Sequence, residues 1–102
     1  MDAQERIRKQ VSDNPIVLYM KGTPDAPMCG FSAAAVQILD ACGVENVATV
    51  DVLADQDIRQ GIKEFSNWPT IPQLYVNGEF VGGADIMREL YQSGELQKLL
   101  GR

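Results

Sequence analysis

The most reactive side chains of this sequence are two cysteines, Cys29 and Cys42, in a chain that contains no histidine. The lack of histidine excludes a Ser-His-Asp triad, a Cys-His nucleophile pair and an imidazole metal site. Two cysteines are too few for a disulfide framework, and too few for a metal site built from the cysteines of one chain. A cysteine that does chemistry here must therefore work with a partner from outside the chain.

Cys29 is expected where a loop turns into a helix. The free N–H groups and the dipole at a helix start favour a thiolate, and Lys21, at the end of a predicted strand, brings a positive charge to the same place. A buried, inert cysteine is the alternative, and position alone does not separate the two. In the motif Cys29-Gly30-Phe31-Ser32, Ser32 occupies the position where a dithiol motif has its second, resolving cysteine.

Cys42 is expected at the far end of the helix that Cys29 precedes. Phe31, Ala35, Ile38 and Cys42 are spaced 4, 3 and 4 apart and predict one apolar face. Thirteen residues at about 1.5 Å each separate the two cysteines by roughly 20 Å, whereas the Cα atoms of a disulfide lie within about 7 Å. We therefore interpret Cys42 as a core residue and not as a disulfide partner of Cys29.

The elements that position these residues alternate between helix and strand. Hydrophobic spacing, the breakers Asn14-Pro15 and the hairpin signal Asn77-Gly78 set the expected boundaries. The expected order is helix 2–13, strand 16–20, loop 21–28, helix 30–42, strand 47–52, a helix from Asp55 or Asp57 to Phe65, an extended connection 67–72, strand 73–76, strand 79–81, helix 84–92 and a last helical turn or two at 95–100. This order predicts an α/β fold with a four-stranded mixed sheet flanked by helices on both faces.

Length and charge narrow the function classes. The 102 residues suit a single domain, 1–102. With 9 basic and 14 acidic residues the net charge is −5, which argues against a nucleic-acid or anionic-membrane binder. No apolar run is long enough to span a membrane, and the polar N-terminus lacks the apolar stretch of a secretory signal. We therefore expect a cytoplasmic protein, since a lone thiolate also needs a reducing compartment.

Three sequence blocks resemble one known family. They are Lys21-Gly22-Thr23-Pro24 followed by Pro27 and Cys29-Gly30-Phe31-Ser32, then Trp68 to Tyr75, and then Gly78 to Ile86. Together, at this spacing and over essentially the whole chain, they resemble the CGFS-type monothiol glutaredoxins in their single-domain bacterial form. The resemblance implies a thioredoxin-like fold and a cis peptide bond before Pro72.

The resemblance also implies a glutathione groove. It assigns binding roles to the residues that match the family's groove, which are Lys21, Cys29, Arg59, Ile71, Ala84 and Asp85. Taken alone, Arg59 also fits a solvated helix face, and Asp85 also fits a helix N-cap. Phe31 and Trp68 suit either the core or the groove wall. Many relatives carry a cysteine at Ala84, which puts in doubt any redox role here that needs a second thiol beside Cys29.

Two functions follow from the resemblance. In the first, Cys29 is the metal ligand, and a [2Fe–2S] cluster is shared between two subunits and two glutathione molecules, because such a cluster needs four ligands. This predicts a homodimer when the cluster is bound, a BolA-like hetero-partner, and iron–sulfur apo-proteins as acceptors. In the second, Cys29 is the catalytic thiol of a glutathione-dependent thiol-disulfide oxidoreductase. We favour the carrier. A binding module that has lost the chemistry is disfavoured by the intact set of Lys21, Cys29, Pro72 and Asp85.

Overall fold

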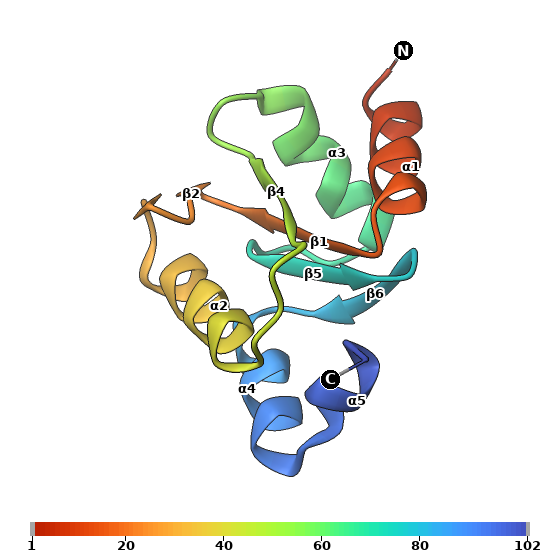
Figure 1. Ribbon diagram of the computed structural model, residues 1–102. Coiled ribbons are helices and arrows are strands. Elements are labelled where there is room, and N and C mark those ends of the chain that lie inside the picture. The colour runs from red at the N-terminus through yellow and green to blue at the C-terminus, as the bar shows by residue number, and fades with distance from the viewer. Residues whose placement is uncertain (1, 102) are drawn as a thin grey trace.

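The computed structural model describes residues 2–101 and alternates helices with strands around one central sheet (Figure 1). The elements in chain order are α1 (Ala3–Asp13), β1 (Ile16–Met20), β2 (Gly22–Thr23), β3 (Ala26–Pro27), α2 (Gly30–Ala41), β4 (Ala48–Asp51), α3 (Gln56–Ser66), β5 (Gln73–Val76), β6 (Glu79–Gly82), α4 (Ala84–Ser93) and α5 (Glu95–Leu99). Within residues 2–101, no helix is both long and apolar enough to cross a membrane.

The central sheet has the strand order β4-β1-β5-β6. Strand β1 runs parallel to β4 and antiparallel to β5, and β5 and β6 form an antiparallel hairpin. The hairpin turns at Asn77-Gly78, where both residues have positive φ angles (52° and 82°), as this turn type requires. The predicted four-stranded mixed sheet is confirmed.

Helices cover both faces of this sheet, as predicted (Figure 1). On one face, α1 and α3 pack over a core that includes Val17, Tyr19 and Tyr75. On the other face, α2, α4 and α5 pack over a core that includes Leu18 and Leu74. Since successive side chains of a strand point to opposite faces, β1 feeds both cores, and all five of its residues are buried. Its unbroken apolar sequence follows from this central place.

The helix boundaries follow from local capping. Asp55 caps α3, and its carboxylate accepts hydrogen bonds from the N–H groups of Asp57 and Ile58. Of the two predicted starts for this helix, Asp55 is therefore the correct one. After α2, Gly43 takes a positive φ of 75°, the conformation that ends many helices.

The segment 21–28, predicted to be a loop, contains a short two-stranded ladder. Strand β2 pairs with β3 in the register Gly22↔Pro27 and Thr23↔Ala26. The chain reverses at residues 24–25. Gly22, which pairs with Pro27 in this ladder, adopts a φ of +90°, which is costly for residues with a Cβ atom. The proline and glycine content that indicated a loop did not reveal this pairing.

The apolar face predicted for α2 is partly wrong. Its fully buried residues are Ser32, Ala35 and Leu39, whereas Phe31 is 59% exposed. The buried face is thus rotated by about one residue from the one that the apolar spacing indicated. The reason is that a serine occupies a core-facing position near the start of the helix, where hydrophobicity alone gives no signal.

We predict that Gly22→Ala destabilises the protein. A Cβ at this position would lie 2.5 Å from the Ala26 carbonyl oxygen and 2.8 Å from the Met28 backbone nitrogen, at a positive φ. The free energy of unfolding should fall by about 1–3 kcal/mol, as measured by urea denaturation.

Gly30→Ala is the matched control for this substitution. A Cβ at Gly30 meets no atom within 4 Å, and Gly30 lies in a helix, so its replacement by alanine should leave stability unchanged or slightly raised. Equal effects of the two substitutions would contradict the steric explanation at Gly22.

Candidate functional site

A cavity of about 400 Å³ opens where the N-terminal ends of α2 and α4 approach the connection between α3 and β5. Cavities of this size suit small-molecule ligands. The lining residues come from segments that are distant in the sequence: Lys21, Cys29, Phe31, Lys63, Trp68, Pro69, Thr70, Ile71, Pro72, Gly83, Ala84, Asp85 and Ile86.

The backbone of Lys21 is fixed from both sides. Its N–H donates to Ser32 Oγ at 3.0 Å, and its carbonyl accepts from the Met28 N–H at 2.9 Å. The next N–H, that of Gly22, donates to Asp51 Oδ1 at 2.9 Å. These bonds tie the end of β1 to α2 and to β4, and they bring Lys21 to the start of the helix that Cys29 caps.

Cys29 is the N-cap residue of α2 and is partly exposed. The backbone N–H of Ser32 holds the pKa of the Cys29 thiol below its ordinary value. Burial opposes this effect and is the second-largest influence on the thiol, while the N–H of Phe31, the charge of Lys21 and the Ser32 hydroxyl each lower its pKa further. The structure thus provides the helix-start environment that favours a thiolate.

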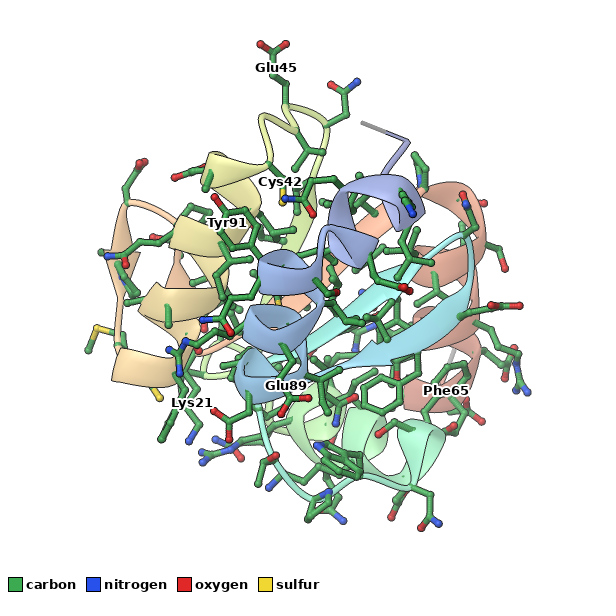
Figure 2. All side chains as sticks on the ribbon, turned by 90° about the horizontal axis from the view of Figure 1, so that it is seen from below. Lys21, Cys42, Glu45, Phe65, Glu89 and Tyr91 are labelled. Atoms are coloured by element: carbon green, nitrogen blue, oxygen red, sulfur yellow. The ribbon has the colours of Figure 1, made fainter. Side chains whose placement is uncertain are left out.

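Cys42 lies at the opposite end of α2. Figure 2 shows Cys42 at one end of α2 and Lys21, from the segment after β1, near the other end. Cys42 is only 8% exposed and packs in the core beneath α2, and burial raises the pKa of its thiol. Both cysteines are free. The interpretation of Cys42 as a core residue is confirmed, and Cys29 is the accessible thiol.

The wall opposite Lys21 is formed by the segment from Trp68 to Pro72. The peptide bond between Ile71 and Pro72 is cis, as the family resemblance implied. Within residues 2–101, no hydrogen bond involves the backbone of Ile71, so its N–H and carbonyl are available to a ligand. Trp68 is 41% exposed and stacks obliquely near Phe80 with 6.0 Å between ring centroids, which places it in the cavity wall and not in the core.

The third wall is the start of α4. Gly83 is the N-cap residue, so the alternative role of Asp85 as an N-cap is wrong. The carboxylate of Asp85 is 82% exposed and lies 3.9 Å from Arg88, a distance at which an exposed pair contributes little. Ala84 and Asp85 both line the cavity, and their N–H groups belong to the first turn of a helix, which favours anions.

Arg59 and Lys63 both lie on α3, one turn apart, and the structure distinguishes them. Lys63 lines the cavity, whereas Arg59 is not among its lining residues. The assignment of Arg59 to a ligand remains a prediction from the resemblance. Sequence reasoning missed Lys63 and Thr70. The available signal for Lys63 was its spacing of four residues from Arg59, which places both side chains on one side of the helix.

The cavity thus combines a nucleophile, cations, N–H donors and an exposed carboxylate. Such a site can hold a small peptide-like ligand with one carboxylate at one end and a second carboxylate and an amine at the other. Within residues 2–101, no group of three or more His, Cys, Asp or Glu side chains could hold a metal ion. A metal centre at Cys29 would therefore need ligands from outside this chain.

Comparison with known proteins agrees with this geometry. The glutaredoxin family model matches residues 16–81. A monothiol glutaredoxin of Synechocystis, described as ycf64-like, is 61% identical over 99 residues, which cover 97% of this chain and 92% of that protein. Glutaredoxin 4 of Escherichia coli is 58% identical over 96 residues, which cover 94% of this chain and 83% of its own length. The chain belongs to the monothiol glutaredoxins.

The solved structures agree with this monothiol glutaredoxin assignment. The solution structure of reduced apo GrxS14 from poplar superposes with a TM-score of 0.82 at 48% identity, covering 95% of this chain and 88% of that one. The thioredoxin-like fold is thereby confirmed. The monothiol character has a simple basis in this glutaredoxin, because Ser32 takes the second cysteine position and Cys42 is buried.

We predict that the lowered pKa of Cys29 governs its alkylation rate. Only the thiolate reacts, so the rate of reaction with iodoacetamide should rise with pH to a half-maximum that lies below the ordinary pKa of a cysteine thiol. Lys21→Gln should move this midpoint to higher pH, because it removes a positive charge that stabilises the thiolate. Mass spectrometry of the timed reaction measures both.

Two controls accompany this experiment. Lys98→Gln removes a positive charge from α5, whose residue Lys98 does not line the cavity, and should leave the midpoint unchanged. In Cys29→Ser the remaining thiol, Cys42, should stay unmodified in the folded protein. A Lys21→Gln midpoint equal to that of the wild type would show that Lys21 does not act on the thiolate.

Proposed function

We propose that this monothiol glutaredoxin binds glutathione in the cavity and, as a dimer, carries a [2Fe–2S] cluster for transfer to apo-proteins. The observation that carries this proposal is the single accessible thiol. Cys29 has a lowered pKa at the mouth of a ligand-sized cavity, and the second cysteine of the chain is buried. The site is therefore half of a ligand set.

Glutathione fits the chemistry of the cavity walls. Its glycine carboxylate can meet Lys21, with Lys63 and the predicted Arg59 on the neighbouring helix. Its central backbone can pair with the free N–H and carbonyl of Ile71. Its γ-glutamyl carboxylate can accept from the N–H groups of Ala84 and Asp85, and its amine can donate to the Asp85 carboxylate. The thiol of such a ligand would then lie toward Cys29.

The ligand count supports a shared cluster. A [2Fe–2S] cluster needs four ligands, and each chain offers one accessible thiolate. Two copies of Cys29 and two glutathione thiolates complete the set. Since two of the four ligands are exchangeable small molecules, the cluster is cargo that can be released to an acceptor.

The surface around Cys29 supports association with a second protein surface. Four large apolar side chains near the cavity are exposed, namely Met28, Phe31, Trp68 and Ile86. Exposed apolar groups gathered in one region mark interaction surfaces. We propose a second copy of the chain as the occupant when the cluster is bound, a BolA-like protein as an alternative partner, and the cytoplasm as the compartment.

The exposure of the Cys29 thiolate also supports a weaker thiol-transferase activity. In its first step the thiolate would attack the glutathione sulfur of a glutathionylated protein, forming a Cys29–glutathione disulfide and releasing the protein thiolate. A second glutathione thiolate would then attack this disulfide, forming oxidised glutathione and restoring Cys29. This route requires no second thiol in the chain.

Anaerobic reconstitution tests the proposed function. The protein is incubated with iron, sulfide and glutathione, and its visible spectrum and mass are recorded. We expect a coloured dimer that forms only with glutathione and contains two irons per two chains. A colourless monomer that rapidly reduces glutathione mixed disulfides would overturn the carrier and favour the transferase.

The two cysteines provide a matched pair of variants for this experiment. Cys29→Ser should abolish the colour and the dimer, because it removes the only accessible thiol. Cys42→Ser should retain both, since Cys42 is buried in the core. Loss of the cluster in Cys42→Ser with an unchanged melting temperature would show that the ligand set is wrong.

A further inference from the structure

Gln73 is a polar side chain in the core, beside the cavity wall. Among residues 2–101, the buried polar or charged residues are Ser32 and Gln73, each with no exposed surface. Burying a polar group is costly unless its hydrogen bonds are satisfied. Ser32 holds the backbone of Lys21, and the partners of Gln73 indicate a corresponding role at the opposite wall.

The carboxamide of Gln73 bridges the protein interior and the Trp68–Thr70 segment. Its Nε2 donates to the carbonyls of Trp68 and Thr70 at 3.2 and 3.1 Å. Its Oε1 accepts from the hydroxyl of Tyr75 at 3.1 Å. Both donors and one acceptor site are therefore used, and the acceptor bond fixes which way the amide faces.

The Trp68–Pro72 segment depends on this support. It contains Pro69 and Pro72, which have no N–H to donate, so the segment cannot form a regular strand ladder. The buried Gln73 amide instead donates hydrogen bonds to two carbonyl groups of this segment. Tyr75, which donates its hydroxyl to Gln73, is buried and packs edge-on against Tyr19, with 5.6 Å between the ring centroids. The wall is thus tied to the core of the α1 and α3 layer.

We propose that Gln73 is a positioning residue for ligand binding, because its buried amide fixes the wall that carries Trp68 and the free backbone of Ile71. Gln73 is absent from the cavity lining, so it acts through these residues and not by touching the ligand. The inference rests on the proposed glutathione binding, while the positioning itself can be measured without ligand.

Trp68 makes this experiment direct, since it is the only tryptophan in the chain. Gln73→Met preserves the approximate length of the side chain and removes both donors. We expect acrylamide to quench Trp68 fluorescence more strongly in this variant. We also expect the dissociation constant for reduced glutathione, measured anaerobically by calorimetry, to rise at least fivefold.

Ile7→Val is the matched control. Ile7 is fully buried in the same core and lies on α1, outside the cavity. The Ile7→Val substitution should lower the melting temperature through lost packing, yet it should leave Trp68 quenching and glutathione affinity within twofold of the wild type. A general loss of stability would instead affect both variants alike.

A second substitution covers the case in which Gln73→Met does not fold. Gln73→Glu retains the shape, but its carboxylate, once ionised, faces the two carbonyl oxygens that Gln73 Nε2 binds. The difference in Trp68 quenching between Gln73→Glu and the wild type, measured at the same pH, should grow from pH 5.5 to pH 8. The wild type and Ile7→Val should show no such pH-dependent divergence.

The outcomes distinguish the positioning role of Gln73 from the proposed glutathione binding. Quenching and affinity that stay within twofold of the wild type in the folded Gln73 variants would overturn the positioning role. If the wild type binds no glutathione, the proposed function fails, and the quenching of Trp68 alone decides whether Gln73 positions this wall.

Discussion

The functional site depends on hydrogen bonds between two buried polar side chains and backbone segments that lie outside the regular helices and strands. A cavity wall made of loops cannot rely on regular strand pairing, and here the Ser32 hydroxyl and the Gln73 amide supply the missing bonds. Ser32 comes from the α2 layer, and Gln73 stands opposite Tyr19 on the face covered by α1 and α3. The Lys21 wall is therefore held from the α2 layer and the Trp68–Pro72 wall from the α1 and α3 layer. The thiol of Cys29 lies where the Ser32 contact brings a helix start and Lys21 together.

Much of this architecture could be predicted from the sequence, because the physical signals were local. The apolar run Ile16–Met20, the Asn77-Gly78 turn and the breakers between segments indicated the correct elements and the mixed sheet. The separation of Cys29 from Cys42 along one helix likewise follows from helix geometry. The placement of Lys21 near Cys29 rested on the expected end of one strand and start of one helix, and the structure brings the two residues together.

The remaining features were set by contacts between distant segments. The pairing of β2 with β3 depends on the positive φ of Gly22, which composition does not reveal. The buried face of α2 includes a serine, so a search for apolar spacing favoured Phe31, which is exposed. Lys63 lines the cavity, and its spacing of four residues from Arg59 shows only that the two side chains share one side of α3, not that this side meets the cavity. The cis bond before Pro72 was expected from the family resemblance alone.

The attachment of the Lys21 wall and the Trp68–Pro72 wall to different layers has a thermodynamic consequence. A ligand that spans the cavity contacts segments anchored in both cores, so it acts as a noncovalent cross-link across the sheet. Ligand that binds only the folded chain adds to its stability in proportion to the logarithm of ligand concentration. Occupancy of the cavity and the stability of the folded chain are thereby linked.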